Sequence, residues 1–206
     1  GVLFLDELPE YERRVIEVLR EPMENGSIAI ARASKKTIFP AKFQLIAAMN
    51  PCPCGHAGNP HKSCNCSAEQ ILRYQRKISN PLLDRIDIHI EMPSIPAELL
   101  TNHITLHNEA SAIIKNRVQH AMNIQQQRSN KANSLLSNNE VKAICNLNKD
   151  GNTIIKKSIE NLNLSARSFY RILKVARTIA DLDNSTDIQI RHLQEALSFR
   201  PKIGGR

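Results

Sequence analysis

The sequence lacks any run of about 18 apolar residues, and this absence excludes a membrane-spanning helix. It also lacks a secretory signal peptide, and no internal repeat or low-complexity tract is present. We therefore expect a cytoplasmic protein without a membrane partner. Apolar residues make up 41% of the 206 residues and charged residues 23%, a balance typical of a globular fold.

The charge that is present is unevenly distributed. The formal net charge is +8, of which +1 falls in residues 1–92 and +7 in residues 93–206. A basic second half favours a polyanionic partner such as nucleic acid. A solvated surface that keeps the protein soluble explains the same charge equally well at this point.

Two continuous apolar runs predict buried strands of a parallel sheet, at residues 2–5 and 43–49. Residues 27–32 and 36–39 predict a hairpin with a basic tip, and residues 86–90 predict a third short strand. The first run reads as a strand entered midway through a fold. We therefore expect the chain to be a piece of a longer protein.

Helices are predicted between and after these strands. One begins at Pro9 and ends near Glu21-Pro22, because the residue before proline avoids helical backbone angles. Its apolar face comprises Val15, Ile16, Val18 and Leu19. Later helices are expected at residues 69–77, 97–127, 138–147, 150–161, 166–182 and 187–199, with a polar linker at 128–139. The fold class is therefore α/β, with an α/β domain over 1–92 and a helical domain over 93–206.

Polar residues suited to phosphoryl transfer follow the predicted strands. Asp6 and Glu7 end the first strand, and open α/β sheets bind ligands at the carboxyl ends of their strands. Phosphoryl transfer needs a carboxylate to hold magnesium and a second group to orient the attacking water. A charged pair that merely closes a strand is an equally good interpretation. Asn50 ends the second predicted strand, where it presents an amide to the same water or acts only as a turn residue.

Two arginine positions add to this pattern. Arg85 directly precedes the third predicted strand, where it stabilises phosphoryl charge in a neighbouring subunit or pairs with Asp84 or Asp87. The helix at 166–182, with Ser165 as its N-cap, has one basic face that predicts a phosphate- or DNA-facing stripe without acidic partners. That face comprises Arg167, Arg171, Lys174 and Arg177, and the opposite apolar face comprises Phe169, Ile172, Leu173, Ala176, Ile179 and Ala180.

Four of the five cysteines are crowded into one loop. In a reducing compartment such a cluster indicates a metal site before it indicates disulfides. Tetrahedral zinc accepts four thiolates or mixed Cys/His sets, although C-x-C pairs are tighter than the usual spacing. The alternative is a reduced loop shaped by its Pro and Gly residues alone. The fifth cysteine, Cys145, is expected to be buried in a helix. The candidate ligands are Cys52, Cys54, Cys64 and Cys66, with His56 and His61 between the two pairs.

Four segments, taken in order, resemble the magnesium-chelatase-like AAA+ proteins and, within them, the bacterial ComM/YifB group: Gly1–Glu7 (GVLFLDE), Ala47–Gly55 (AAMNPCPCG), Ser79–Asp87 (SNPLLDRID) and Ser165–Leu182 (SARSFYRILKVARTIADL). The resemblance runs over essentially the whole chain. It implies that residues 1–92 are the C-terminal part of a AAA+ αβα core and that residues 93–206 are its helical lid.

The resemblance also implies roles for single residues and a ligand set of ATP and Mg²⁺. Asp6 and Glu7 match the Walker B motif, Asn50 matches sensor 1, Arg85 matches the arginine finger, and Arg167 matches the sensor 2 arginine of the lid. Asp6 and Arg167 would then contact the bound nucleotide and its metal. Residues 27–39 fall at a hairpin that faces the pore of a hexameric ring, where the basic tip would contact single-stranded or branched DNA. The tip residues are Arg32, Lys35 and Lys36.

For the ComM group the resemblance implies a DNA branch-migration helicase of natural transformation. The alternatives are a AAA+ remodeller of a protein or metal-chelatase complex, and a non-enzymatic basic module that binds DNA. One departure from the family pattern is that the phosphate-binding loop, GxxxxGK[ST], occurs nowhere in the sequence. Its amides and lysine cradle the β- and γ-phosphates. The chain by itself is therefore expected to hydrolyse little or no ATP.

Overall fold

The structure is a computed structural model that describes residues 1–32, 35–93, 109–162 and 164–201. The chain divides into two compact units. The first unit comprises Gly1–Ile86 with Met92–Ser94, and the second comprises Asp87–Glu91 with Ile95–Arg206. Of the helices that the structure describes, none is long and apolar enough to cross a membrane.

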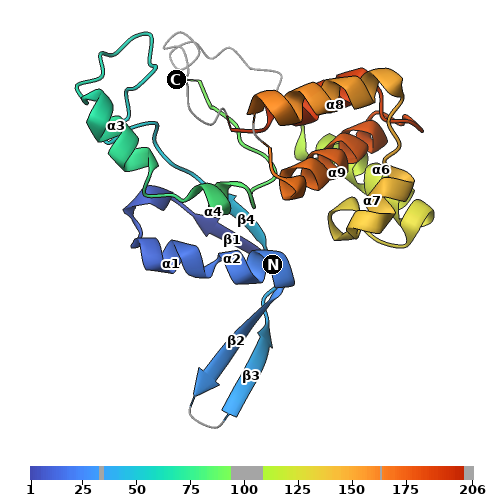
Figure 1. Ribbon diagram of the computed structural model, residues 1–206, viewed down its shortest axis with the longest axis horizontal. Coiled ribbons are helices and arrows are strands. Elements are labelled where there is room, and N and C mark those ends of the chain that lie inside the picture. Colours follow the sequence, from blue (N-terminus) through green and yellow to red (C-terminus); the bar gives the residue numbers. More distant parts are fainter. Residues whose placement is uncertain (33–34, 94–108, 163, 202–206) are drawn as a thin grey trace. The chain divides into compact units, whose positions relative to one another are not determined.

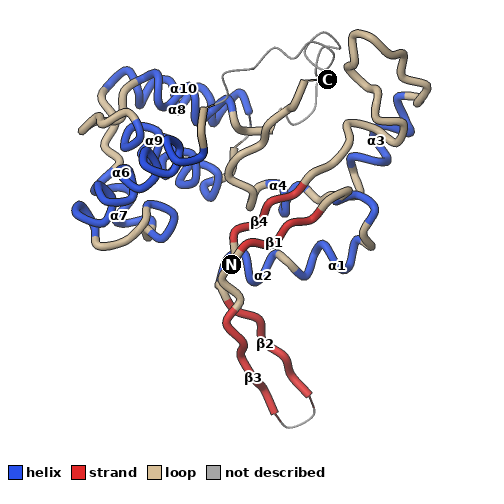
Figure 2. The backbone as a smooth tube through the Cα atoms, turned by 180° about the vertical axis from the view of Figure 1, so that it is seen from behind, coloured by secondary structure: helices blue, strands red, loops and turns tan. Residues whose placement is uncertain are grey.

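The first unit contains a parallel pair of strands and a hairpin (Figure 1). Strands β1 (Val2–Leu5) and β4 (Gln44–Ala47) pair in parallel, from Val2 opposite Gln44 to Leu5 opposite Ala47. Strands β2 (Ser27–Arg32) and β3 (Lys35–Pro40) form the predicted antiparallel hairpin, which extends away from that pair (Figure 2). The strands predicted at 2–5 and 43–49 are thus confirmed.

The expectation that both strands of the parallel pair are buried is wrong. Alternate side chains are open to solvent, with Val2 64%, Phe4 60% and Ile46 44% exposed. On the other face, Leu5 packs against a small core of Leu8, Ile16, Ile78 and Leu82. The face that carries Val2, Phe4 and Ile46 is therefore an exposed apolar face. Within the described residues this sheet has only two strands.

The segment after β1 forms a short 3-10 helix and two α-helices, η1 (Leu8–Glu10), α1 (Arg13–Val18) and α2 (Arg20–Asn25). The prediction of a single helix ending near Glu21-Pro22 is wrong. The break comes at Leu19 instead, and Pro22 lies in the first turn of α2, where its missing N–H has no intrahelical partner to lose. The predicted apolar face is only partly right, because Ile16 is buried while Val15 and Val18 are exposed.

The helix predicted at 69–77 is confirmed as α3 (Ala68–Gln75), and α4 (Asn80–Leu83) follows. The strand predicted at 86–90 is wrong, because those residues form an extended segment without strand pairing. His89 N–H donates one hydrogen bond of 2.9 Å to Phe199 O. An alternating pattern favours extended backbone, but a strand also needs a partner strand, and the described residues supply none there.

The second unit is helical, as predicted. Its elements are α6 (Ser111–Ser129), η2 (Asn133–Leu135), α7 (Asn138–Ile144), α8 (Lys149–Leu162), α9 (Ala166–Leu182) and α10 (Ile190–Ser198). The part of the first predicted helix at 97–108 lies outside the described residues. Helix α9 is central, since it contacts α6, η2, α7 and α10.

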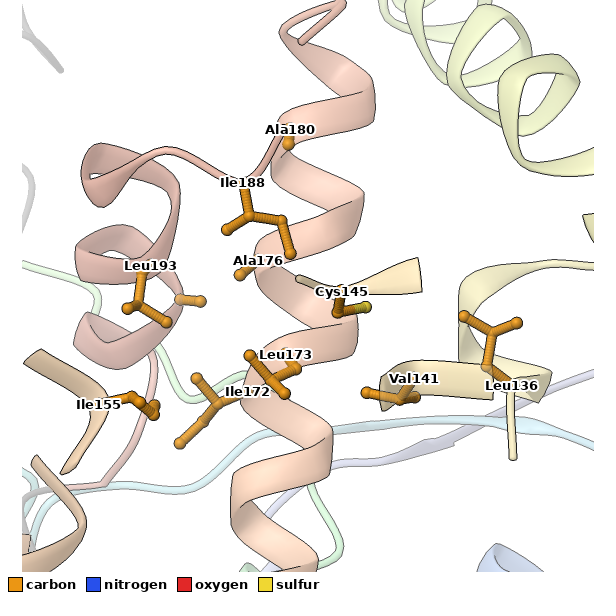
Figure 3. Packing of buried hydrophobic residues seen from close by; sticks show 11 residues of the cluster. Leu136, Val141, Cys145, Ile155, Ile172, Leu173, Ala176, Ala180, Ile188 and Leu193 are labelled. Atoms are coloured by element: carbon orange, nitrogen blue, oxygen red, sulfur yellow. The ribbon is translucent and has the colours of Figure 1, made fainter. Parts of the chain in front are cut away.

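The core of the second unit gathers on the predicted apolar face of α9 (Figure 3). Ile172, Leu173, Ala176 and Ala180 are each at most 3% exposed, and Phe169 and Ile179 pack against them. Cys145 is 4% exposed within this cluster, which confirms its predicted burial. Ser165 Oγ accepts the Ser168 N–H at 3.1 Å and caps the helix, as predicted.

Candidate functional site

Backbone hydrogen bonds hold the carboxyl ends of β1 and β4 together. Ala48 N–H donates to Leu5 O at 2.9 Å, and Leu8 N–H donates to Ala48 O at 3.0 Å. Asp6 and Glu7 follow β1 directly, and Asn50 follows β4 by three residues. The structure therefore brings these three predicted residues to one edge of the sheet, where open α/β sheets bind their ligands.

Glu7 has an unusual backbone conformation. Its φ of 50° and ψ of 43° lie in the left-handed region, which non-glycine residues adopt rarely. The Glu7 N–H donates to Asp6 Oδ1 at 2.9 Å, and the next residues, Leu8 and Pro9, are buried. Such strain persists where surrounding structure enforces it, and it concentrates at functional sites. No sequence pattern indicated this feature of Glu7.

Asn50 is exposed, and it lies beside the cysteine-rich loop. A Cβ atom added to Gly55 would lie 4.0 Å from Asn50 Cγ. Gly55 itself has a φ of +78°, which side-chain-bearing residues rarely adopt. The Asn50 amide therefore lies near this turn of the loop.

Arg85 is buried, at 6% exposure, and contacts other parts of the first unit. Its Nη2 lies 2.7 Å from Glu24 Oε2, and its Nη1 donates to Pro81 O at 2.6 Å. Sequence reasoning named Asp84 and Asp87 as ion-pair partners and missed Glu24, which is 61 residues away. Both of these contacts join Arg85 to other residues of the first unit.

The predicted basic stripe of α9 is not a free cationic surface. Arg177 is 2% exposed and pairs with Asp181 at 3.1 Å, and Arg171 pairs with Asp87 at 2.5 Å. Lys174 donates to Ser134 O, and burial lowers the pKa of its ammonium group. The expectation of a face without acidic partners is therefore wrong. Asp181 belongs to the same helix and follows Arg177 by four residues, so a helical projection of residues 166–182 places it beside the stripe, and the sequence reasoning overlooked it. Asp87 comes from a distant segment that such a projection does not contain.

The remaining predicted site residues are Arg167 and those of the hairpin tip. Arg167, the second residue of α9, is exposed. Lys36 is exposed on β3 at the hairpin tip. The side chains of Arg32 and Lys35 lie outside the described part of the structure, although their backbones belong to β2 and β3.

The four loop cysteines meet in one cluster. Their Sγ atoms all lie within 4.8 Å of one another, and three separations are 3.4, 3.7 and 3.5 Å. A disulfide requires about 2.0 Å between its sulfur atoms, so these are free thiols. Zinc–sulfur bonds of about 2.3 Å place the sulfurs of a tetrahedral site about 3.8 Å apart. The donor set and its spacing therefore fit one tetrahedral metal ion, and neither His56 nor His61 belongs to the cluster.

Hydrogen bonds from nearby N–H groups lower the pKa values of the cluster's thiols, whereas burial and crowding raise them. The N–H groups of His56 and Asn65 lower the pKa of Cys54 to about 6. The Cys66 N–H lowers the pKa of Cys64, but burial and the neighbouring Cys54 and Cys52 thiols outweigh it and raise that pKa to about 12. Four thiolates so close together repel one another, and a cation between them removes that repulsion.

Comparison with known proteins agrees with this geometry. The family model for magnesium chelatase, subunit ChlI, matches residues 1–100, and the model for the C-terminal region of subunit ChlI matches residues 108–200. The chain belongs to this magnesium-chelatase-type AAA+ family. The predicted resemblance and fold class are thereby confirmed.

Individual relatives cover nearly all of this chain. The uncharacterized protein YifB of Escherichia coli (strain K12) is 46% identical over 200 residues, and the competence protein ComM of Haemophilus influenzae is 45% identical over 203 residues. An uncharacterized protein of Mycobacterium tuberculosis (strain H37Rv) is 34% identical over 204 residues. The alignments cover 97%, 98% and 97% of this chain but 39%, 39% and 40% of the relatives. The chain thus spans about two fifths of the length of these curated relatives.

Sequence reasoning missed several residues that organise this magnesium-chelatase-type chain. Tyr74 is buried, and burial raises the pKa of its hydroxyl. Gln75 Nε2 donates to Pro51 O at 3.2 Å. The capping box of α3, formed by Ser67 and Gln70, could have predicted where this helix begins. It carries no information about the contacts of the C-terminal end of the helix.

Proposed function

We propose that this chain is the C-terminal part of a AAA+ subunit that hydrolyses ATP in a hexameric ring and acts on DNA. The observation that carries the proposal is the meeting of Asp6, Glu7 and Asn50 at the carboxyl edge of two parallel strands, with Glu7 in a strained conformation. The uncovered face of this sheet and the two-fifths coverage of the relatives support a longer subunit.

In this proposal Asp6 holds Mg²⁺, which supplies charge neutralisation for the phosphates of ATP. The carboxylate of Glu7 orients the attacking water and the Asn50 amide faces the same water or the γ-phosphate. Asp6 is exposed at the strand end, and a carboxylate oxygen is a ligand that Mg²⁺ prefers. Because the 206-residue sequence contains no phosphate-binding loop, turnover depends on a loop supplied from outside these residues.

Two arginines complete the proposed site. Arg85 acts across a subunit interface as an arginine finger, and Arg167 responds to nucleotide from the helical lid. Glu24 holds the Arg85 guanidinium within its own subunit in the structure. A role in a neighbouring site therefore requires that ring assembly or nucleotide binding exchange the Glu24 carboxylate for phosphate, since both are bidentate anionic partners of guanidinium.

DNA is the proposed substrate because the hairpin tip is basic and because one relative is named a competence protein, ComM. A ring repeats the tip of each β2–β3 hairpin around its pore, so weak contacts add by multivalency. The four cysteines hold a structural zinc ion in this proposal, since their sulfur spacing suits a tetrahedral thiolate site.

The test is ATP hydrolysis by the full-length protein with no DNA, single-stranded DNA and branched DNA. Stimulation by DNA is expected. Hydrolysis that DNA leaves unchanged would instead favour a remodeller of a protein or metal-chelatase complex. DNA binding without any hydrolysis would favour a non-enzymatic DNA-binding module.

A further inference from the structure

The cysteine cluster lies between two structural elements, the end of β4 and the start of α3. Cys52 follows Asn50-Pro51 at the end of β4, and it is buried. Cys66 directly precedes Ser67, the N-cap of α3. That cap is fixed by a reciprocal capping box, in which Ser67 N–H donates to Gln70 Oε1 at 2.8 Å and Gln70 N–H donates to Ser67 Oγ at 3.2 Å. An ion in the cluster therefore joins the end of β4 to the start of α3.

The other end of α3 returns to the same segment after β4. Gln75, its last residue, donates from Nε2 to Pro51 O at 3.2 Å. Helix α3 is thus tied to residues 50–52 at both of its ends. One tie is through the Gln75 side chain, and the other is through the sulfur cluster.

Asn50 lies at the junction of these ties. Its neighbour Pro51 is held by Gln75, and a Cβ atom added to Gly55 of the loop would lie 4.0 Å from the Asn50 Cγ. Contacts between thiols join the two ends of the loop from Cys52 to Cys66, with Cys64 Sγ 3.7 Å from Cys52 Sγ and 3.5 Å from Cys54 Sγ. Closing such a loop with a metal removes many of its conformations.

We propose that the metal-bound cluster and α3 form a clamp that fixes Asn50 at the nucleotide site. Gln75 acts in it as a positioning residue. The proposal rests on the zinc site and on the role of Asn50 in the proposed function. It predicts that breaking either tie makes residues 50–52 less rigid.

The direct test is hydrogen–deuterium exchange on the full-length protein, with zinc content measured for every sample. Wild type and the control His61→Ala should carry about one zinc per chain, and Cys64→Ser should carry less, because a structural site needs all four ligands. Gln75→Ala should keep its zinc. Peptides that cover residues 48–57 should exchange faster in both Cys64→Ser and Gln75→Ala than in wild type. Unchanged exchange in these peptides would overturn the clamp.

The catalytic test is a double-mutant cycle between Gln75 and Asn50. Gln75→Ala should lower kcat about threefold to tenfold, the range set by one lost hydrogen bond, and leave nucleotide affinity within about twofold. In an Asn50→Ala background, Gln75→Ala should cause no further loss, because the clamp acts through Asn50. Losses that simply multiply would show that Gln75 does not position Asn50.

The outcomes separate the clamp from the assignments on which it rests. Wild-type protein that carries no zinc, when purified with its cysteines reduced, would overturn the metal-dependent tie. Normal hydrolysis by Asn50→Ala would contradict the proposed role of Asn50. The exchange of residues 48–57 would then still decide whether α3 and the cluster hold this segment.

Discussion

At the scale of single residues, Glu7 combines a carboxylate with a conformation that costs free energy. Non-glycine residues held in the left-handed region cost on the order of 1–3 kcal/mol, which surrounding structure must offset. In Glu7 this conformation turns the chain directly after the strand, between the Asp6 carboxylate and the buried Leu8. It is the feature that most clearly distinguishes Asp6-Glu7 from an ordinary charged pair at a strand end.

Glu7→Gln in the full-length protein should abolish ATP turnover while nucleotide binding persists. The substitution removes the group that orients water and leaves Asp6 to hold the metal. Turnover and nucleotide affinity should be measured together. Glu10→Gln is the matched control, since Glu10 is an exposed carboxylate three residues away that pairs with Lys77. Hydrolysis near the wild-type rate in Glu7→Gln would refute the Walker B assignment.

Arg85→Ala should stop hydrolysis in the assembled protein, because the developing phosphoryl charge loses its stabilising guanidinium. Mixing Arg85→Ala with Glu7→Gln subunits should restore some activity, since each mutant supplies what the other lacks at a shared site. Glu24→Gln is the control, because it breaks the same ion pair and keeps the arginine. If both single variants lose stability and activity alike and mixing restores nothing, Arg85 is structural.

At the scale of elements, α9 is held by a buried polar network as well as by its apolar core. The Asp181 carboxylate accepts hydrogen bonds from Arg128 at 2.6 and 2.7 Å, from Asn133 at 2.8 Å and from Arg177 at 3.1 Å. Asn133 and Asp181 are each 1% exposed. Residues 128–139, predicted as a polar linker, thus include side chains that fix η2 and the end of α6 against α9. Arg128 and Asn133 of that segment thus belong to a network around the buried Asp181 carboxylate, whereas other polar residues there, such as Ser134, are exposed.

Asp181→Ala should lower the free energy of unfolding of the full-length protein by about 3–5 kcal/mol, because it leaves the buried Arg177 and the half-buried Arg128 without their carboxylate. The control Glu69→Ala breaks another i,i+4 pair, whose side chains are 80% and 83% exposed. That change should cost about 0–1 kcal/mol. Chemical denaturation measures both. Equal losses would mean that the Asp181 network adds nothing beyond a surface pair.

The hairpin is the element for which DNA contact is proposed. Neutralising Arg32, Lys35 and Lys36 together should weaken DNA binding and DNA-stimulated hydrolysis and leave basal hydrolysis largely intact. Binding should also depend less steeply on salt, since fewer counterions are released. The matched control neutralises three lysines of α8, Lys149, Lys156 and Lys157. An equal effect of both triple variants would point to overall charge, and no effect of the hairpin variant would exclude the tip as the DNA contact.

At the scale of the whole molecule, the chain spans about two fifths of the length of its curated relatives. Within the described residues its parallel sheet has two strands and one exposed apolar face. The 206-residue chain alone should show no ATP hydrolysis above background, because it contains no phosphate-binding loop. The full-length protein should hydrolyse ATP under the same conditions. Turnover by the isolated chain that Glu7→Gln abolishes would show that a different segment binds the phosphates.

By itself the sequence determined the features whose causes are local. The two strands, the hairpin, the capped helix at 166–182 and the crowding of four cysteines each follow from apolar periodicity, a cap or close spacing along the chain. The tertiary structure alone decided which groups meet. Arg85 with Glu24, Arg171 with Asp87, and Gln75 with Pro51 after β4 are residues from 24 to 84 positions apart. Local patterns carry no information about such pairs, because packing brings them together only when the chain has folded.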